Sequence, residues 1–84
     1  MGALAMNVSV RYYGQLAEIA ESEEEHYQFE HGAKVRDLLS DVHRKHPEAG
    51  TVAITVALND QFSGEETALH EGDRVDLFPP FAGG

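Results

Sequence analysis

Apolar and polar residues alternate along four segments of the chain, which predicts four β-strands. These segments are 7–13, 26–30, 51–58 and 74–78. Each places Val, Leu, Ile, Tyr or Phe side chains on one face and mostly polar side chains on the other. The polar loop before the last segment has room for a fifth, short strand around Thr67 to Leu69.

Two other segments repeat their apolar residues with the period of a helix. A short helix is predicted after the first strand, and a longer one over the segment "KVRDLLSDVHRKHPE". Pro47 disfavours helical geometry at the residue before it and is expected to end the longer helix. One helix of this length covers one face of a small sheet, so we predict an α+β roll. We expect its first and last strands to lie side by side at the centre. The longer helix carries its apolar stripe on Val35, Leu38, Leu39, Val42 and His46.

The composition indicates one globular domain. The chain has 84 residues, of which 42% are hydrophobic and 25% charged, and its net charge is -9. This charge disfavours nucleic acid and anionic membranes as partners and suits a protein with a basic docking surface. No apolar run reaches the length of a membrane helix and no secretory signal is visible, so we expect a cytoplasmic protein. Residues 1–6 are interpreted as an N-terminal extension or a vector-derived remnant.

The sequence ends in "DLFPPFAGG". Two glycines can enter a channel too narrow for other residues and leave the terminal carboxyl of Gly84 unhindered. Pro79 and Pro80 stiffen the exit from the last strand, while Phe78 and Phe81 supply apolar anchors. A carboxylate must be activated before a nucleophile attacks it, and no phosphate-binding loop is present to do this. The activation is therefore expected from another protein, unless the Gly-Gly is an inert end or a cloning remnant.

Few other residues suggest a reactive site. The chain has no cysteine, which excludes disulfides, thiolate zinc sites and a cysteine nucleophile. His43 and His46 have the i,i+3 spacing that can bind a metal, but no carboxylate is obviously convergent with them. We interpret both as structural and predict no metal site. The acidic segment "SEEE" is interpreted as a solvated loop.

Three segments together carry a family resemblance: "VRYYGQLAEIA", "KVRDLLSDVHRKHPE" and "RVDLFPPFAGG". They resemble the small subunit of molybdopterin synthase, a MoaD-type ubiquitin-like sulfur carrier of the MoaD/ThiS superfamily. The resemblance implies a β-grasp fold over residues 7–78, followed by an extended tail over residues 79–84. This fold has a mixed four- to five-stranded sheet, one long helix packed on one face and a short helix after the first strand.

The resemblance also implies a function for the tail. A partner activating enzyme would use ATP to adenylate Gly84, which would then become a thiocarboxylate and donate sulfur for the molybdopterin dithiolene. The implied partners are this adenylylating enzyme, a sulfur donor protein and the large subunit of molybdopterin synthase. The chain itself would bind no cofactor and would be a non-catalytic, sulfur-carrying subunit. The implied partner-binding residues are Phe78, Pro79, Pro80, Phe81, Ala82 and Gly83.

One residue departs from the family pattern, since Phe81 stands where relatives usually have a smaller branched residue. A partner channel must be wider at this point or must stack an aromatic ring. Three other functions remain open at this stage. The chain could be the sulfur carrier of the thiamine pathway, a protein modifier joined to targets through Gly84, or a ubiquitin-like binding domain with an inert tail.

Overall fold

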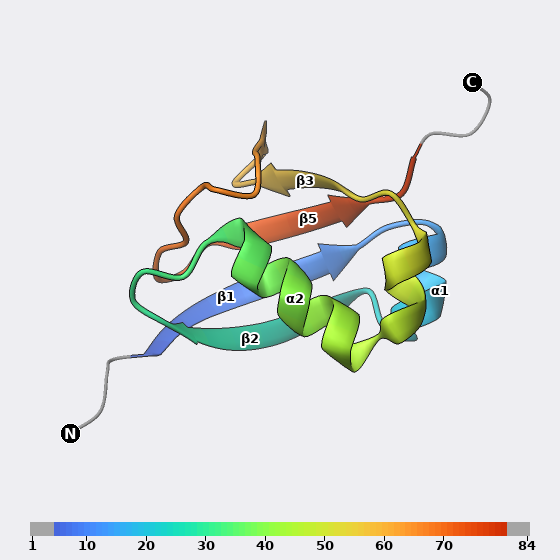
Figure 1. Cartoon of the computed structure of the whole chain (residues 1–84), viewed down its shortest axis with the longest axis horizontal. Helices are drawn as coiled ribbons and strands as arrows, with labels where there is room; N and C mark the ends of the chain where they lie inside the picture. The colour runs from blue at the N-terminus through green and yellow to red at the C-terminus, as the bar shows by residue number, and fades with distance from the viewer. Residues whose placement is uncertain (1–4, 81–84) are drawn as a thin grey trace.

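The computed structural model describes residues 5–80, which form a five-stranded mixed sheet with helices on one face and at one end (Figure 1). The strand order is β2-β1-β5-β3-β4, with β1 and β5 parallel and the other neighbouring pairs antiparallel. The predicted α+β architecture is confirmed, including the central position of the first and last strands. In chain order the elements are β1 (Ala5–Tyr12), α1 (Gln15–Ala20), β2 (Glu24–Glu30), α2 (Val35–Lys45), the 3-10 helix η1 (Pro47–Thr51), β3 (Thr55–Leu58), β4 (Gln61–Phe62) and β5 (Arg74–Phe78).

The core lies between α2 and the helix-facing side of the sheet. The predicted stripe of α2 is buried at Val35, Leu38 and Val42, and the two central strands supply most of its partners. Burial of each such side chain contributes about 1.5–3 kcal/mol before the entropy of ordering is subtracted. The buried hydrophobic residues of the central strands are Met6, Val8, Val10, Tyr12, Val75 and Leu77.

The start of α2 is stabilised in a way that the sequence did not reveal. Lys34, at the N-cap, has no side-chain oxygen, but its backbone N–H donates to Asp37 Oδ2 at 2.8 Å. The first two free N–H groups of the helix donate to the carbonyls of Thr67 and Glu65, at 2.9 and 3.0 Å. This loop therefore satisfies the helix end instead of forming the short strand predicted around Thr67 to Leu69. That prediction was wrong, and only a single bridge joins Lys34 to Ala68.

Several element boundaries also differ from the sequence-based expectation. The strand predicted at 51–58 begins only at Thr55, because Pro47–Thr51 forms η1 and buries Ala49. The first strand begins at Ala5 rather than Asn7, and the second at Glu24 rather than His26. Within residues 5–80, no helix combines the length and hydropathy needed to span a bilayer.

A tight turn at Asn59 and Asp60 follows β3. Both residues have positive φ values, 49° and 72°, and they join β3 to the two-residue strand β4. Asn59 also holds the start of β5, because its Oδ1 accepts from the Arg74 N–H at 3.0 Å. The outer strand β4 is thus fixed beside β3, which places Phe62 next to Ala57.

Candidate functional site

The structure describes the base of the predicted tail. β5 ends at Phe78, and Pro79 and Pro80 follow it outside the ladder, as their missing N–H groups require. The other predicted site residues lie outside the described part of the chain: they are Phe81, Ala82, Gly83 and Gly84. The geometry of the site is therefore that of the sheet end from which the tail begins.

An aromatic pair marks this end of the sheet. The rings of Tyr13 and Phe78 stack with centroids 4.6 Å apart and planes inclined by 14°. Both residues follow inward-facing residues of the central strands, so both lie on the sheet face opposite α2. Ala57 and its cross-strand neighbour Phe62 share this face, and Phe62 is 76% exposed. We call the residues Tyr13, Ala57, Phe62 and Phe78 the open sheet face.

Charged side chains interrupt the open sheet face at its centre. Asp76 is buried on β5, and its Oδ2 lies 3.8 Å from Arg74 Nε. Arg74 also pairs with Asp60 in the turn before β4. Within residues 5–80, Asp76 Oδ1 has no hydrogen-bond partner. Arginine and aromatic side chains are both enriched at the centres of protein interfaces, so this face has the composition of a docking surface.

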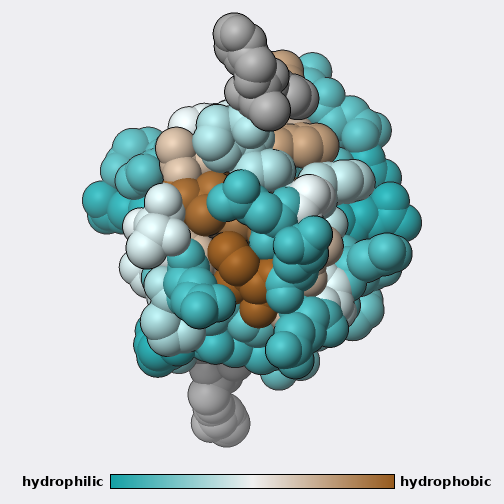
Figure 2. Space-filling model, turned by 90° about the vertical axis from the view of Figure 1, so that its right-hand side faces the viewer, coloured by the Kyte–Doolittle hydropathy of each residue, from teal (hydrophilic) through white to brown (hydrophobic). Residues whose placement is uncertain are grey.

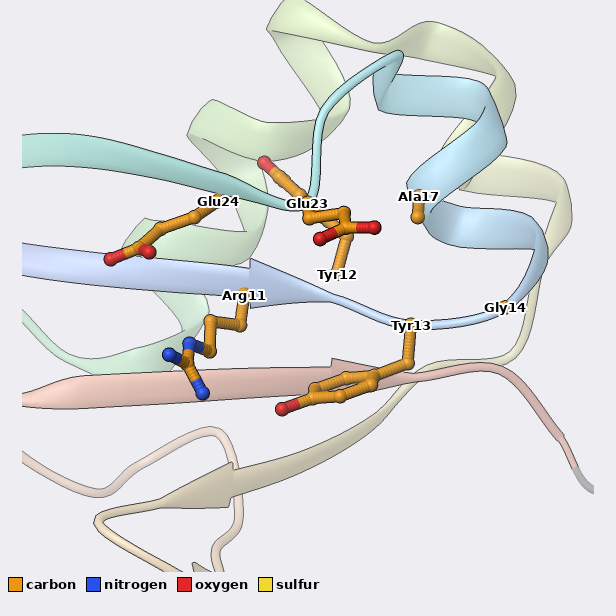
Figure 3. Close-up of a pocket in the computed structure, with 7 residues that line it drawn as sticks. All are labelled: Arg11, Tyr12, Tyr13, Gly14, Ala17, Glu23 and Glu24. Atoms are coloured by element: carbon orange, nitrogen blue, oxygen red, sulfur yellow. The ribbon is translucent and has the colours of Figure 1, made fainter.

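A shallow hollow of about 420 Å³ lies beside the aromatic pair (Figure 3). Arg11 and Tyr13 extend from the end of β1 and the residue after it, Glu23 and Glu24 lie just before and at the start of β2, and Ala17 comes from α1 (Figure 3). Because both signs of charge line it, the hollow has no clear preference for an anion or a cation. Its residues are Arg11, Tyr12, Tyr13, Gly14, Ala17, Glu23 and Glu24.

The end of the molecule that carries α1 and η1 also exposes apolar side chains. Figure 2 shows a hydrophobic strip surrounded by hydrophilic residues on this end. The half-buried aliphatic residues of these elements and of the segment before β3 are Ile19, Val52 and Ile54. Neither α1 nor η1 carries a basic residue.

A polar cluster lies on the helix-facing side of the sheet, against the C-terminal end of α2. The Glu25 carboxylate accepts hydrogen bonds from the hydroxyls of Tyr12 and Tyr27, at 2.6 and 3.0 Å. His46 Nε2 lies 3.1 Å from this carboxylate, and Lys45 Nζ lies 3.3 Å from it. The side chain of Glu25 is only 12% exposed, so its charge is stabilised by four surrounding donors rather than by solvent.

These contacts shift the pKa values within the cluster. Burial opposes ionisation of Glu25, but hydrogen bonds from Tyr12, His46, Tyr27 and Lys45 outweigh it and lower its pKa to about 2. Burial and the neighbouring carboxylate raise the pKa of Tyr27 to about 12, although its hydrogen bond with the Tyr12 hydroxyl opposes this. Burial, with the hydrogen bond to Glu25, also raises the pKa of Tyr12 above its usual range.

The sequence-based interpretation missed this cluster. We expected "SEEE" to be a solvated loop and no carboxylate to converge on the helix histidines, but Glu25 contacts His46 directly. The available signal was the alternation of Tyr27 and Phe29, which extends backwards to place Glu25 on the same inward face. His43 is exposed, and within the described residues no three His, Asp or Glu side chains are placed to hold a metal.

The sequence of this chain is similar to those of known proteins. Residues 10–84 match the ThiS family. The chain is 32% identical over 83 residues to the molybdopterin synthase sulfur carrier subunit of Chlamydomonas reinhardtii, which covers 94% of this chain and all of that protein.

Two solved structures are also similar. Small archaeal modifier protein 1 of H. volcanii superimposes with a TM-score of 0.83 at 26% identity, covering 90% of this chain and 99% of that one. A chain of the complex of subunits 1 and 2 of molybdopterin-converting factor from Helicobacter pylori gives a TM-score of 0.69 at 28% identity, covering 94% and 100%. These likenesses confirm the predicted β-grasp fold.

Proposed function

This chain belongs to the ThiS family, and we propose that it is a sulfur carrier for molybdenum cofactor biosynthesis. Its carboxyl group at Gly84 is adenylated, converted to a thiocarboxylate, and donates sulfur for the molybdopterin dithiolene. The observation that carries this proposal is the 32% identity, over the full length of the relative, to a molybdopterin synthase sulfur carrier subunit. The central strand β5 supports it by leading directly into the Phe-Pro-Pro segment.

The chemistry has two balanced steps before transfer. A carboxylate oxygen of Gly84 attacks the α-phosphorus of ATP and pyrophosphate leaves, which gives an acyl-adenylate. Hydrosulfide from a sulfur donor then attacks the acyl carbon, AMP leaves and a proton is released, which gives the thiocarboxylate. Neither the site nor the sequence offers a phosphate-binding loop, so a partner enzyme must bind the ATP.

The open sheet face supports the proposal that a large subunit of molybdopterin synthase docks beside the tail. Tyr13 and Phe78 place an aromatic surface at the base of the tail, and Phe62 extends it to the sheet edge. A face of this kind can fix the carrier while the tail enters the partner's active site. The H. pylori relative was solved in complex with a second subunit, which agrees with docking of this kind.

A second candidate function is protein modification through Gly84. The fold likeness to small archaeal modifier protein 1 favours it, since that protein matches 90% of this chain. Both functions begin with the same acyl-adenylate and differ only in the nucleophile. A sulfur nucleophile gives a thiocarboxylate, whereas a lysine amine of a target protein gives an amide.

The test is intact-mass analysis of the chain after incubation with the host's activating enzyme, ATP and sulfide. We expect the mass gain that corresponds to replacement of one oxygen by sulfur. The thiocarboxylated chain, mixed with a large synthase subunit and the cyclic pterin precursor, should then yield the dithiolene product and return to the carboxylate. Gly84-dependent covalent ladders on other proteins would move the assignment to a modifier. Product from the thiazole-forming enzyme alone would move it to the thiamine pathway.

A further inference from the structure

The turn between β1 and α1 contains a glycine in a conformation that other residues rarely adopt. Gly14 has a φ of 56° and a ψ of -134°, which is strained for any L-residue with a side chain. It is also closely packed, because a Cβ atom at this position would lie 3.0 Å from Pro79 Cγ and 3.7 Å from Pro79 Cδ. Glycine is therefore favoured at position 14 for two reasons. The turn needs a positive φ, and Pro79 leaves no room for a side chain.

The same turn holds the last residues of β5 by two further contacts. The backbone N–H of Tyr13 donates to the Leu77 carbonyl at 3.2 Å, which continues the parallel ladder one residue beyond Tyr12. The ring of Tyr13 stacks on Phe78. Leu77, Phe78 and Pro79 are thus each contacted by the Tyr13–Gly14 pair.

Pro79 is the first residue of the tail, and the Tyr13–Gly14 turn contacts it. It has no N–H with which to extend the ladder, so the direction of the chain after Phe78 depends on its fixed φ and on packing. The Pro79 ring lies against Gly14, where it leaves no room for a Cβ atom. A methyl group at position 14 would force Pro79, or the turn itself, to move.

We propose that Gly14 is a positioning residue that sets the direction in which the tail leaves the domain, and so places Gly84 for activation. This inference depends on the proposed function, because it concerns delivery of the same carboxyl group. It assigns no chemistry to Gly14 itself. The effect passes through Pro79 to the tail.

Two other glycines provide matched controls. Gly32 and Gly72 also have positive φ values, 94° and 82°, but a Cβ atom at either position would meet nothing within 4 Å. Gly32 lies in the turn between β2 and α2, and Gly72 lies in the turn before β5. Alanine at either position is also placed at a positive φ, but it makes no contact with Pro79.

The experiment compares Gly14→Ala with Gly72→Ala in adenylation by the host's activating enzyme, measured as pyrophosphate release. Both variants should lose a few degrees in Tm, because both place alanine at a positive φ, and Gly14→Ala should lose more because its methyl group also meets Pro79. Misplacement of a reacting group by about 1 Å can reduce a rate about 100-fold, so we expect kcat to fall at least about tenfold in Gly14→Ala alone. KM should stay within about twofold, because the substitution removes no side chain that could contact the activating enzyme.

A double variant tests whether the effect passes through Pro79. Replacing Pro79 by alanine removes the ring atoms that a Cβ at position 14 would meet. The loss caused by Gly14→Ala should therefore shrink to about the Gly72→Ala level in a Pro79→Ala background. An equal loss in both backgrounds, or equal kcat values for Gly14→Ala and Gly72→Ala, would overturn the inference. Absence of adenylation of the unaltered chain would instead contradict the proposed function.

Discussion

Replacement of Glu25 by glutamine should weaken the domain in a pH-dependent way. The Glu25 carboxylate joins three elements, because it accepts from Tyr12 on β1 and Tyr27 on β2 and contacts His46 at the end of α2. Glutamine has nearly the same size but carries no charge and adds two donors of its own. It cannot satisfy four surrounding donors as the carboxylate does.

The magnitude follows from the pKa of Glu25. It is lowered from 4.5 to about 2, and at about 1.4 kcal/mol per unit this corresponds to about 3 kcal/mol of stability. Because the pKa is lowered on folding, the contribution is complete above pH 4.5 and is lost as the pH falls towards 2. Lys45 is half-exposed and its attraction is partly screened, so we expect a loss of about 2–3 kcal/mol at pH 7.

The assay is chemical denaturation of both proteins between pH 7 and pH 2. At pH 7 the variant should be less stable by the stated amount, with a Tm lower by about 10 °C or more. The difference should narrow between pH 4.5 and pH 2. Glu30→Gln, at an exposed position at the end of β2, is the control and should change stability by less than about 0.5 kcal/mol. A difference that stays constant over this pH range would refute the assigned role of the carboxylate.

Two further predictions concern docking and the tail. Phe62→Asp should leave Tm nearly unchanged, because Phe62 is 76% exposed, but should weaken binding to the large synthase subunit at least about tenfold in calorimetric titration. Unchanged affinity would mean that the open sheet face is not the docking surface. Deletion of Gly84 should abolish thiocarboxylate formation by intact-mass analysis while the thermal unfolding curve stays superimposable. A large loss of stability on this deletion would mean that the tail contributes to the fold.

Hydrophobic patterning was sufficient to predict the central elements. Alternation at Val8 and Val10, and at Val75 and Leu77, indicated the two strands that the structure places at the centre. The period of α2 indicated the helix and its buried face. These segments are predictable because burial of one apolar face contributes most of the stability of each of them.

Features that depend on tertiary contacts were not predictable in the same way. The sequence of the loop at 65–69 suggests a weak strand. In the structure, carbonyls of this loop accept hydrogen bonds from the first N–H groups of α2, and no local sequence pattern reveals such a contact. Gly14 was not singled out, because a glycine in a sequence shows neither its φ nor its neighbour. A role for Phe78 was predicted from the tail motif, whereas its partner Tyr13 appeared only as the last residue of a predicted strand.

The parallel pairing of β1 with β5 has a consequence for the order of events during synthesis. Ser9 is in register with Arg74, so the middle of the sheet joins segments that lie near opposite ends of the chain. Until β5 emerges, β1, β2 and α2 have apolar faces without their central partner, and such long-range pairing is slow to form. The strand that completes the core is also the one that carries Phe78 and leads into Pro79. A nascent chain therefore acquires its fold and the anchored base of its tail in the same step.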